Sequence, residues 1–453
     1  MASGIPDAAA VPPAAVGERL AAGGLLEWLL IPLGLVLSLV TFSHVLVGDD
    51  RARFQMLSTL LEYRRLLPIK YSLVGPILAA PFWFAGKAMG NPAAAVGLYD
   101  WLLLCVGLVA FHFVLRRHAS PVLVRRFLLL LVAGSMFPRH VLHFGAEPFT
   151  NLAAGIGLAL AGLDVTWGWG LAIAGVLNTP AAQPALAFAA ARRAWDERRF
   201  RYLLVPVVAV VLALLEMWLR LGALFRTGYE GDAGLRTVMP YSGRPGFSYP
   251  IFFGLLSELL SFGKGLAWFA PGLWLLLRGR RLDLPEALRP VLRLWLAFLL
   301  ALLLLYGKYW GWYGGVSAGP RYFLFASLPA TLLLAAFLAR PPAGWGEALA
   351  ALALLGLSCW GVVATTIFEG GGLDLCTANG YALENLCWYT PEFSVLWNPF
   401  VGPLRALTVK EWSLIGYEAA VVLVLGWPAL RALAASAWRG AGVVREALGS
   451  FRV

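Results

Sequence analysis

The chain has 453 residues, of which 60% are hydrophobic and only 13% are charged. A soluble protein of this size carries roughly twice that share of charged residues, so the composition excludes a soluble globular class. Long apolar runs favour membrane-spanning helices over a closed barrel, whose strands alternate only weakly. The net charge is +11, but the sequence contains no polar domain with a basic, aromatic-rich stripe. This argues against a nucleic-acid partner. Membrane topology and contact with anionic membrane lipids explain the charge better.

The apolar runs predict an all-α, polytopic integral membrane protein with about twelve transmembrane helices in one domain, residues 25–433. Residues 1–24 lack the pattern of a cleavable signal, and we expect a disordered cytoplasmic tail there. Residues 434–453 form a second expected cytoplasmic tail. The expected spans cover residues 25–47, 98–114, 127–136, 149–163, 166–178, 180–191, 202–224, an interrupted span around 261–265, and then 291–306, 323–338, 346–367 and 413–433.

Clusters of arginines set the expected orientation, because basic loops usually stay in the cytoplasm. The clusters are Arg116, Arg117, Arg125 and Arg126; Arg192, Arg193, Arg198, Arg199 and Arg201; and Arg278, Arg280, Arg281 and Arg289. This orientation places both termini in the cytoplasm and all the lysines outside. Positive charge on the outer face, among glycines and aromatics, suits a site for a lipid phosphate. The alternative is that these residues anchor helices at lipid headgroups.

The first extracytoplasmic loop, residues 48–97, opens with the pair Asp49 and Asp50. Carboxylates are costly near hydrocarbon, so two of them at the mouth of a span indicate a site, and the alternative is an ordinary polar loop. A carboxylate there can take a proton from an attacking hydroxyl. Adjacent carboxylates do not easily point into one site, so we expect one base and one helper. The residues from 51 to 67 have a helical period suited to the interface, and 73–84 resembles a re-entrant element.

A second acidic candidate follows two histidines in the loop after residue 136. Glu147 comes after His140 and His143 and directly precedes Pro148. It can act as a second acid or as a ligand of a divalent metal such as Mg²⁺ or Mn²⁺. As the first residue of a helix it has an equally good structural explanation.

The loop 307–322 combines glycines and aromatics with an arginine at the outer start of a span. Arg321 can hold a phosphate through two parallel hydrogen bonds. An interfacial aromatic belt would explain Trp310 and Trp312, but not Arg321 or the glycines. Lys264 lies between glycines in an interrupted span, where the backbone can approach a ligand. A lysine at a helix kink, without a partner, is the alternative for that residue.

Two of the four cysteines lie in one polar segment, residues 368–412. Cys376 and Cys387 can form a disulfide there if the segment faces an oxidising compartment. Cys105 and Cys359 lie in apolar runs and are expected to fill the core.

Several of these motifs together resemble a known family, the GT-C superfamily of membrane glycosyltransferases. The opening Gly48-Asp49-Asp50 with Arg53 and Phe54 is similar to the acidic motif of polyprenyl-phosphate-sugar-dependent protein mannosyltransferases and aminoarabinose transferases. The segment 70–76 resembles the interfacial segment that follows in such chains. Residues 261–266 and 312–322 are similar to runs in bacterial family-39-like membrane proteins.

The resemblance implies an inverting transfer of a sugar from a polyprenyl-phosphate donor, such as an undecaprenyl one, to an acceptor hydroxyl. The acceptor would be a glycolipid, a polysaccharide or a protein, and the reaction would take place on the periplasmic face of the bacterial inner membrane. Asp50 or Asp49 would be the base. The donor phosphate would bind Arg321, Lys264 and Lys70. The expected acceptor, sugar or metal region contains Glu147, His143, His140, Tyr71, Trp310, Trp312 and Tyr322.

Two other classes of protein compete with this interpretation. Interrupted helices and charges within the membrane are equally expected of a transporter or a lipid flippase. Against that class, the charges crowd one face instead of the midplane, and the sequence shows no clear internal repeat. A structural scaffold is the third class.

Overall fold

The computed structural model describes residues 13–230, 234, 236–244, 246–281, 284–402 and 405–450. These residues contain helices and no strand, which confirms the all-α class. The first twelve residues of the expected N-terminal tail, and the last three of the expected C-terminal one, lie outside the described residues. The first apolar stretch, Gly24–Thr41, begins close to the expected residue 25, but residues 13–23 are helical and not disordered, because the first helix already begins at Pro13. The last helix likewise continues through the expected C-terminal tail to Ser450.

The described residues form α-helices and 3-10 helices, which are labelled η. In chain order they are α1 (Pro13–Thr41), α2 (Asp49–Tyr63), α3 (Val74–Leu78), α4 (Ala80–Ala88), α5 (Pro92–Gly97), α6 (Tyr99–Leu115), α7 (Pro121–Ala133), α8 (Phe137–His140), α9 (Glu147–Gly162), α10 (Gly168–Asn178), η1 (Pro180–Ala182), α11 (Gln183–Glu197), η2 (Phe200–Leu203), α12 (Leu204–Leu221), α13 (Ile251–Leu260), α14 (Leu266–Phe269), η3 (Pro271–Arg281), η4 (Glu286–Leu288), α15 (Arg289–Tyr306), η5 (Arg321–Ala326), α16 (Ser327–Leu338), α17 (Trp345–Ile367), α18 (Glu369–Tyr381), α19 (Glu384–Tyr389), η6 (Pro391–Phe393), η7 (Asn398–Phe400) and α20 (Val409–Ser450).

Within the described part of the chain, 7 helical stretches are long and apolar enough to cross a bilayer. They are Gly24–Thr41, Pro92–Leu115, Phe200–Leu221, Glu286–Tyr306, Arg321–Leu338, Trp345–Ile367 and Val409–Trp438. The protein is therefore an integral membrane protein. Shorter apolar helices, among them α7, α9 and α10, pack between these stretches.

Small residues allow some of these shorter helices to approach closely. A Cβ atom at Gly157 of α9 would lie 2.5 Å from the backbone nitrogen of Ala172 in α10. One at Gly175 of α10 would lie 2.8 Å from the backbone nitrogen of Ala154. Glycine is therefore needed at both positions, as is common where membrane helices pack backbone against backbone.

A buried charge cluster joins α1 to α7 and corrects one expectation. Arg125 and Arg126, expected in a cytoplasmic loop, belong to α7, which begins after the capping residue Ser120. Both arginines form ion pairs with Glu27 of α1, whose side chain is buried. Buried charges persist only when they are paired, so these arginines hold two helices together. This pairing could not be predicted from the sequence because the partners lie about a hundred positions apart.

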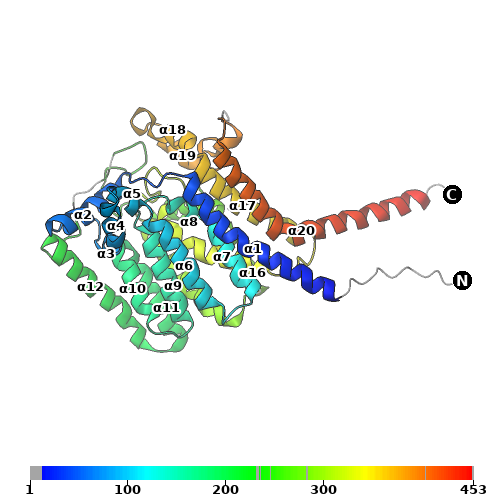
Figure 1. Ribbon diagram of the computed structural model, residues 1–453, viewed down its shortest axis with the longest axis horizontal. Coiled ribbons are helices and arrows are strands. Elements are labelled where there is room, and N and C mark those ends of the chain that lie inside the picture. Colours follow the sequence, from blue (N-terminus) through cyan, green and yellow to red (C-terminus); the bar gives the residue numbers. More distant parts are fainter. Residues whose placement is uncertain are drawn as a thin grey trace.

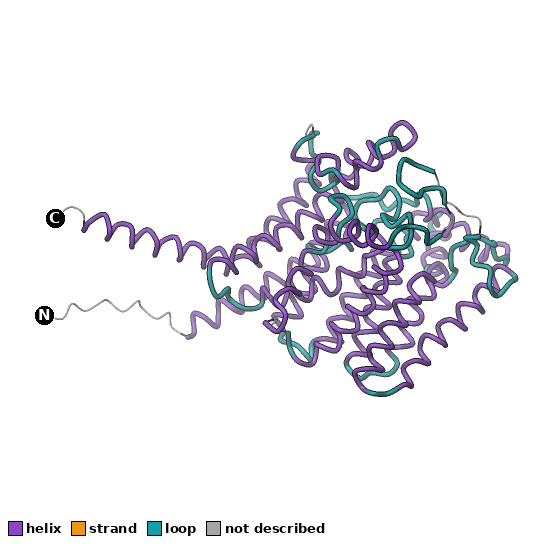
Figure 2. The backbone as a smooth tube through the Cα atoms, turned by 180° about the vertical axis from the view of Figure 1, so that it is seen from behind, coloured by secondary structure: helices purple, strands orange, loops and turns teal. Residues whose placement is uncertain are grey.

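The connecting segments gather at one end of the helix bundle, which we call the loop end. Figure 1 shows α2 to α5 and α18 and α19 there, whereas the connection from α11 to α12 lies at the opposite end. Figure 2 shows loops concentrated at the loop end, away from the two chain termini. Helix α20 bends near Pro428 and its last part leaves the bundle on the side of the termini. The expected loop 48–97 therefore folds as a layer of short helices across the loop end.

The interfacial helix expected after the carboxylate pair is α2. Gly48 precedes it with a φ of 52°, a conformation that favours glycine. Asp49 and Asp50 then occupy the first turn, where negative side chains interact favourably with the helix dipole. The helix ends at Arg64 in a left-handed conformation. The aspartates are thus fixed at the start of a helix rather than in a flexible loop.

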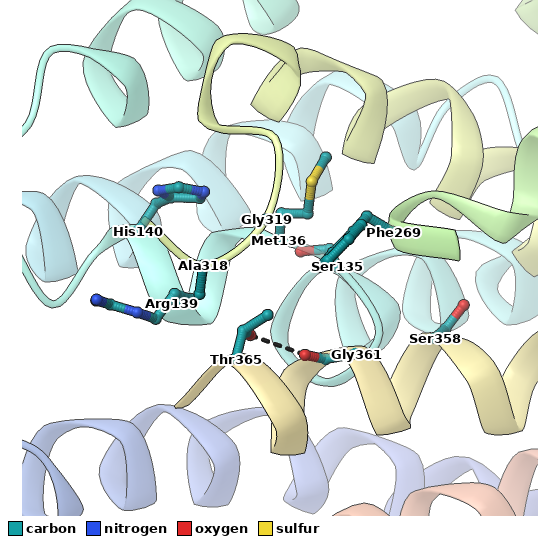
Figure 3. A pocket seen from close by; sticks show the side chains of 10 residues that line it. All are labelled: Ser135, Met136, Arg139, His140, Phe269, Ala318, Gly319, Ser358, Gly361 and Thr365. Carbon is teal, nitrogen blue, oxygen red and sulfur yellow. Dashed lines mark hydrogen bonds between the residues drawn. The ribbon is translucent and has the colours of Figure 1, made fainter. Parts of the chain in front are cut away.

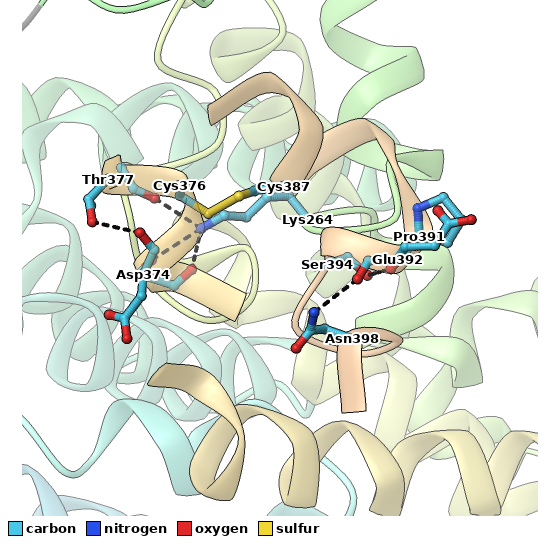
Figure 4. The surroundings of a disulfide bond; sticks show 11 residues. Lys264, Asp374, Cys376, Thr377, Cys387, Pro391, Glu392, Ser394 and Asn398 are labelled. Atoms are coloured by element: carbon cyan, nitrogen blue, oxygen red, sulfur yellow. Dashed lines mark hydrogen bonds between the residues drawn. A yellow bond between two sulfur atoms is a disulfide. The ribbon is translucent and has the colours of Figure 1, made fainter. Parts of the chain in front are cut away.

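Cys376 and Cys387 form a disulfide between α18 and α19 at the loop end, and Lys264 lies beside this bond in Figure 4. We expect mass spectrometry of the purified, non-reduced protein to find these two cysteines linked. Closing a loop of sequence separation 11 should contribute about 2–3 kcal/mol to stability in the chain-entropy picture. The paired variant Cys376→Ser/Cys387→Ser should therefore unfold at a lower temperature, whereas Cys105→Ser should not. Free thiols at both positions would contradict the assignment.

Candidate active site

Four segments of the chain meet around Asp49 and Arg321. The Tyr71 hydroxyl donates a hydrogen bond of 2.6 Å to Asp49 Oδ1. Arg321 Nη1 lies 3.6 Å from Asp49 Oδ2, and Arg321 Nε lies 3.9 Å from Glu147 Oε1. The contributing elements are α2, the segment before α3, the start of α9 and the start of η5. The structure therefore brings together four residues that the sequence analysis selected from separate motifs.

Asp50 points to a different set of partners. Its side chain is buried, and its Oδ2 accepts a hydrogen bond of 3.4 Å from the backbone N–H of Val47. The same oxygen lies 3.6 Å from Nδ1 of His143. Arg139 contacts the other ring nitrogen of His143 and also pairs with Glu369. The two adjacent carboxylates thus diverge, one towards Arg321 and the other towards His143.

Their surroundings also separate the pKa values of the two aspartates. Burial raises the pKa of Asp50 to about 6, and the nearby carboxylate of Glu147 acts in the same direction. Burial would also raise the pKa of Asp49. The hydrogen bond from Tyr71 and the positive charges of Arg321, Arg53 and Lys70 outweigh this effect, so the pKa of Asp49 lies below its ordinary value. A general base works best when its pKa is near the operating pH, which Asp50 matches and Asp49 does not.

The two histidines have different neighbours. Burial lowers the pKa of His143 to about 4, with Arg139 adding to the effect, so His143 is neutral at pH 7. His140 lines a small cavity together with Arg139, Ala318 and Gly319 (Figure 3). The cavity volume of about 10 Å³ leaves room for roughly one water molecule. This cavity is too small to hold a sugar.

Two further cations surround the Tyr71 ring. Lys70 Nζ lies 5.6 Å from its centroid and 5.2 Å from that of Tyr229. The guanidinium carbon of Arg53 lies 4.6 Å above the Tyr71 ring. Arg53 is only 8% exposed, and among the described residues its Nε and Nη1 have no hydrogen-bond partner.

Arg53 was missing from the candidate residues, although the motif contained it. It follows Asp49 by four positions on α2, which places both on one face of the helix. That spacing was a signal for including it in the site. Its unpaired donors make it suited to binding an anion.

Lys264 occupies a different place from the one expected. Its side chain is fully buried, and Nζ donates to the carbonyl oxygens of Gly315, Ser317 and Gly319 at 3.1, 2.6 and 2.9 Å. A lysine ammonium has three protons, so these contacts use its hydrogen-bonding capacity inside the protein. Direct contact with a donor phosphate was therefore the wrong expectation, and so was the alternative of a lysine without a partner.

The aromatic residues of the loop 307–322 are also more buried than expected. Trp310 and Trp312 are 6% and 1% exposed, so they belong to the core and form no interfacial belt. The Tyr322 ring stacks on Tyr306, with centroids 4.4 Å apart. The guanidinium carbon of Arg321 lies 5.3 Å from the Tyr322 centroid. Tyr322 thus supports Arg321, whereas the two tryptophans do not offer a surface for a sugar.

The carboxylates do not form a suitable metal site. Arg321 lies between Asp49 and Glu147, and its positive charge takes the place that a cation would need. Within the described ranges, no group of three or more His, Cys, Asp or Glu side chains is arranged to hold a metal ion. We therefore derive no step through Mg²⁺ or Mn²⁺.

Fold and site together define a helical membrane protein with carboxylate, arginine and histidine side chains gathered at one end of its bundle. A scan against models of protein families finds no match to the chain, and a search of curated proteins finds none. Among solved structures, the chain is similar to the crystal structure of ArnT from Cupriavidus metallidurans bound to undecaprenyl phosphate. The identity is 15% and the TM-score 0.49, over 89% of this chain and 77% of that chain. Such a likeness does not assign a function, so the proposal below rests on the geometry of the site.

Proposed function

We propose that this protein is an inverting glycosyltransferase of the bacterial inner membrane. It moves a sugar from a polyprenyl-phosphate donor to an acceptor hydroxyl of a glycolipid, polysaccharide or protein at the periplasmic face. One observation carries the proposal: at the loop end Asp50, a buried carboxylate whose pKa burial raises to about 6, directly follows Asp49, which contacts Arg321. Such a pairing of base and anion-binding groups is what transfer from a phosphate to a hydroxyl requires.

In the proposed reaction Asp50 accepts the proton of the acceptor hydroxyl. The freed oxygen attacks the anomeric carbon from the face opposite the phosphate, and a new glycosidic bond forms. The bond from that carbon to the phosphate oxygen breaks, and the lipid phosphate leaves with the electron pair. Arg321 stabilises the negative charge that develops on the phosphate. Asp49 and Glu147, on either side of Arg321, hold its guanidinium in position.

Arg53 is a second group suited to the departing phosphate. Its buried, unpaired N–H groups lie on the same helix as both aspartates. An unpaired buried donor costs free energy, which a bound anion would recover. Lys70 also lies near the Tyr71 ring and adds positive charge to the same region. The cations around Tyr71 therefore form the expected phosphate side of the site.

A transporter or flippase is the competing class, and the position of the charges disfavours it. Carriers place their ligand groups near the middle of the bilayer, at interrupted helices. Here Asp49 and Asp50 begin α2, Glu147 begins α9 and Arg321 begins η5, all at helix starts. The ammonium of Lys264, in the interrupted region at residues 261–265, is bound by backbone carbonyls of the protein itself. The chemistry is thus concentrated at one membrane face.

The proposed orientation places the loop end in the periplasm, and cysteine labelling tests it. Glu392 is exposed in η6, which follows α19 at the loop end. Arg117 is exposed in the connection between α6 and α7, at the opposite end of the bundle. In a background without Cys105 and Cys359, Glu392→Cys should react with a membrane-impermeant maleimide in intact cells. Arg117→Cys should react only after the inner membrane is permeabilised. The reverse pattern would contradict the periplasmic site.

A transfer assay in detergent tests the proposed activity. The purified protein is mixed with a radiolabelled polyprenyl-phosphate sugar and an extract of envelope lipids, polysaccharides and proteins. Transfer requires no bilayer, so we expect a labelled product and one released lipid phosphate per sugar transferred. A carrier would move its substrate across proteoliposomes without forming a glycosidic bond. Movement without a new bond would therefore overturn the proposal in favour of a transporter.

A further inference from the structure

We propose that Lys264 is a positioning residue whose buried ammonium holds the loop 314–319 in the conformation that presents Arg321. The inference rests on the proposed function, because it assigns Lys264 a role in the same site. Lys264 does not touch the substrate in this account. It acts through the backbone of the loop and through Arg321.

The loop folds around the ammonium group. Gly314, Gly315 and Gly319 have φ values of 72°, 74° and 73°, in the left-handed region that favours glycine. These conformations turn the carbonyls of Gly315, Ser317 and Gly319 towards one point, which Lys264 Nζ occupies. The Ser317 hydroxyl provides a fourth contact at 3.2 Å. The loop therefore wraps a cation supplied by a different part of the chain.

The convergence of these carbonyls needs a positive charge. Without one, the negative ends of three backbone dipoles would face each other in a buried space. Buried carbonyls without a partner cost free energy, so the loop would have to open towards water. A neutral side chain at position 264 would leave all three oxygens unpaired. Lys264 thus determines the shape of the loop rather than merely filling space beside it.

Both ends of the loop contact Arg321. The backbone N–H of Arg321 donates a hydrogen bond of 3.1 Å to the Gly319 carbonyl, which also accepts from Lys264. At the other end, a Cβ atom on Gly314 would lie 2.9 Å from Arg321 Cγ. Opening the loop would therefore shift the backbone of Arg321 and remove the surface against which its side chain packs.

Lys264 is itself held from the opposite side. The backbone N–H of Gly263 donates to the carbonyl of Trp388 at 3.1 Å, and a Cβ on Gly263 would lie 2.2 Å from the Cys387 carbonyl oxygen. The Trp388 ring centroid lies 4.7 Å from Lys264 Nζ. Figure 4 shows Lys264 next to the disulfide that ties this segment to α18. A fixed scaffold therefore sets the position of the ammonium.

A half-buried carboxylate, Glu369, supports the same loop and connects it to His143, which lies beside Asp50. Glu369 Oε1 accepts a hydrogen bond of 3.1 Å from the backbone N–H of Ala318. The other oxygen of Glu369 pairs with Arg139, which contacts His143 beside Asp50. The loop thus has one cation on its carbonyls and one anion on an N–H group. Its position is set by both, and Lys264 makes the larger number of bonds.

Non-additivity of variants distinguishes positioning from direct contact with substrate. We expect Lys264→Met to lower kcat/KM for sugar transfer by roughly 10- to 100-fold, because small displacements of a binding group have effects of this size. In an Arg321→Ala background the same change should lower it by less than about 3-fold, because the group that it positions is gone. Full additivity would contradict the proposal and indicate a direct role for the lysine.

A second variant opens the loop without removing the buried charge. Gly315→Ala places a methyl group whose nearest neighbour is Arg321 Nη2 at 4.0 Å, so space is not limiting. Its φ of 74° disfavours alanine, which should loosen the loop. We expect the same loss of kcat/KM as for Lys264→Met, again small in the Arg321→Ala background. The control is Lys410→Met, because exposed Lys410 donates to the carbonyl of Val40, far along the chain from this loop.

Hydrogen exchange provides a readout that does not depend on activity. In wild type and Lys410→Met, the hydrogen-bonded amides of Gly314, Ser317, Ala318 and Arg321 should exchange slowly, and in Lys264→Met they should exchange at least about 10-fold faster. Unchanged exchange in Lys264→Met would overturn the positioning role even in an active enzyme. If wild-type protein transfers no sugar, the proposed function fails, whereas faster exchange would still support the role of Lys264 in the loop. If Lys264→Met does not fold, Gly315→Ala decides the question by the same two measurements.

Discussion

Asp50→Asn is expected to lower the turnover of sugar transfer by roughly 10²–10⁴, the usual contribution of a general base. Asparagine keeps the shape of the side chain and can still accept the hydrogen bond from Val47. It cannot take a proton from the acceptor hydroxyl. Binding of the donor lipid should therefore change little, because the phosphate side of the site is intact. The measurement is kcat with a radiolabelled donor, together with donor affinity from a separate binding assay.

Asp49→Asn is the matched control for this variant. Asp49 accepts from Tyr71 and lies beside Arg321, so its loss should act mainly on the phosphate side. We expect a smaller fall in kcat and a weaker affinity for the donor. Full activity in both variants would contradict the mechanism, and a larger loss of turnover in Asp49→Asn would transfer the role of base to that residue.

The pH dependence of kcat/KM provides an independent test of the same assignment. A base must be deprotonated to act, so activity is present above its pKa and falls as the pH drops through it. With Asp50 as base, the acid limb should lie near pH 6, where burial places its pKa. If Asp49 were the base, the limb would lie below pH 4, because its pKa is lowered from an ordinary value of 3.8. The position of the limb therefore distinguishes the two aspartates without a mutation.

Arg321→Ala is expected to weaken donor binding and to lower kcat by roughly 10²–10³, as for other groups that stabilise a developing negative charge. The same guanidinium contacts the ground-state phosphate and the leaving group, so both quantities should change. Arg321→Lys keeps the charge but loses the paired hydrogen bonds, and should recover only part of the loss. Arg405→Ala is the control, because Arg405 is exposed and pairs with Glu411. Unchanged donor affinity in Arg321→Ala would contradict its assignment to the phosphate.

The fold class was predictable because apolar runs of bilayer length directly reflect helices in a membrane. The ends of the individual helices were less predictable. The first span ends at Thr41 rather than at residue 47, and α7 begins at Pro121 within the expected arginine loop. That error had a physical cause: Arg125 is paired with Glu27, and only the fold brings the two together.

The site was predictable where its residues stand in compact motifs. Asp49, Asp50 and Arg321 were recognised from local sequence, and the structure brings Arg321 to Asp49. The environment of Lys264 could not be predicted in this way. Its partners are backbone carbonyls of a loop about fifty positions away. The direction of a backbone carbonyl cannot be inferred from the residue type, except that glycines mark unusual backbone conformations. The burial of Trp310 and Trp312 was not predicted, because a run of aromatic residues is typical both of a protein core and of a membrane interface.

Electron cryomicroscopy of the protein with a polyprenyl phosphate would show where the lipid phosphate binds. We expect phosphate density in contact with Arg321 and Arg53, within reach of Asp50 and on the side of Asp49 that faces Tyr71. This density should be lost in Arg321→Ala. Phosphate density at the opposite end of the bundle, or density that persists unchanged in Arg321→Ala, would mean that the arginines of the loop end do not bind the donor phosphate.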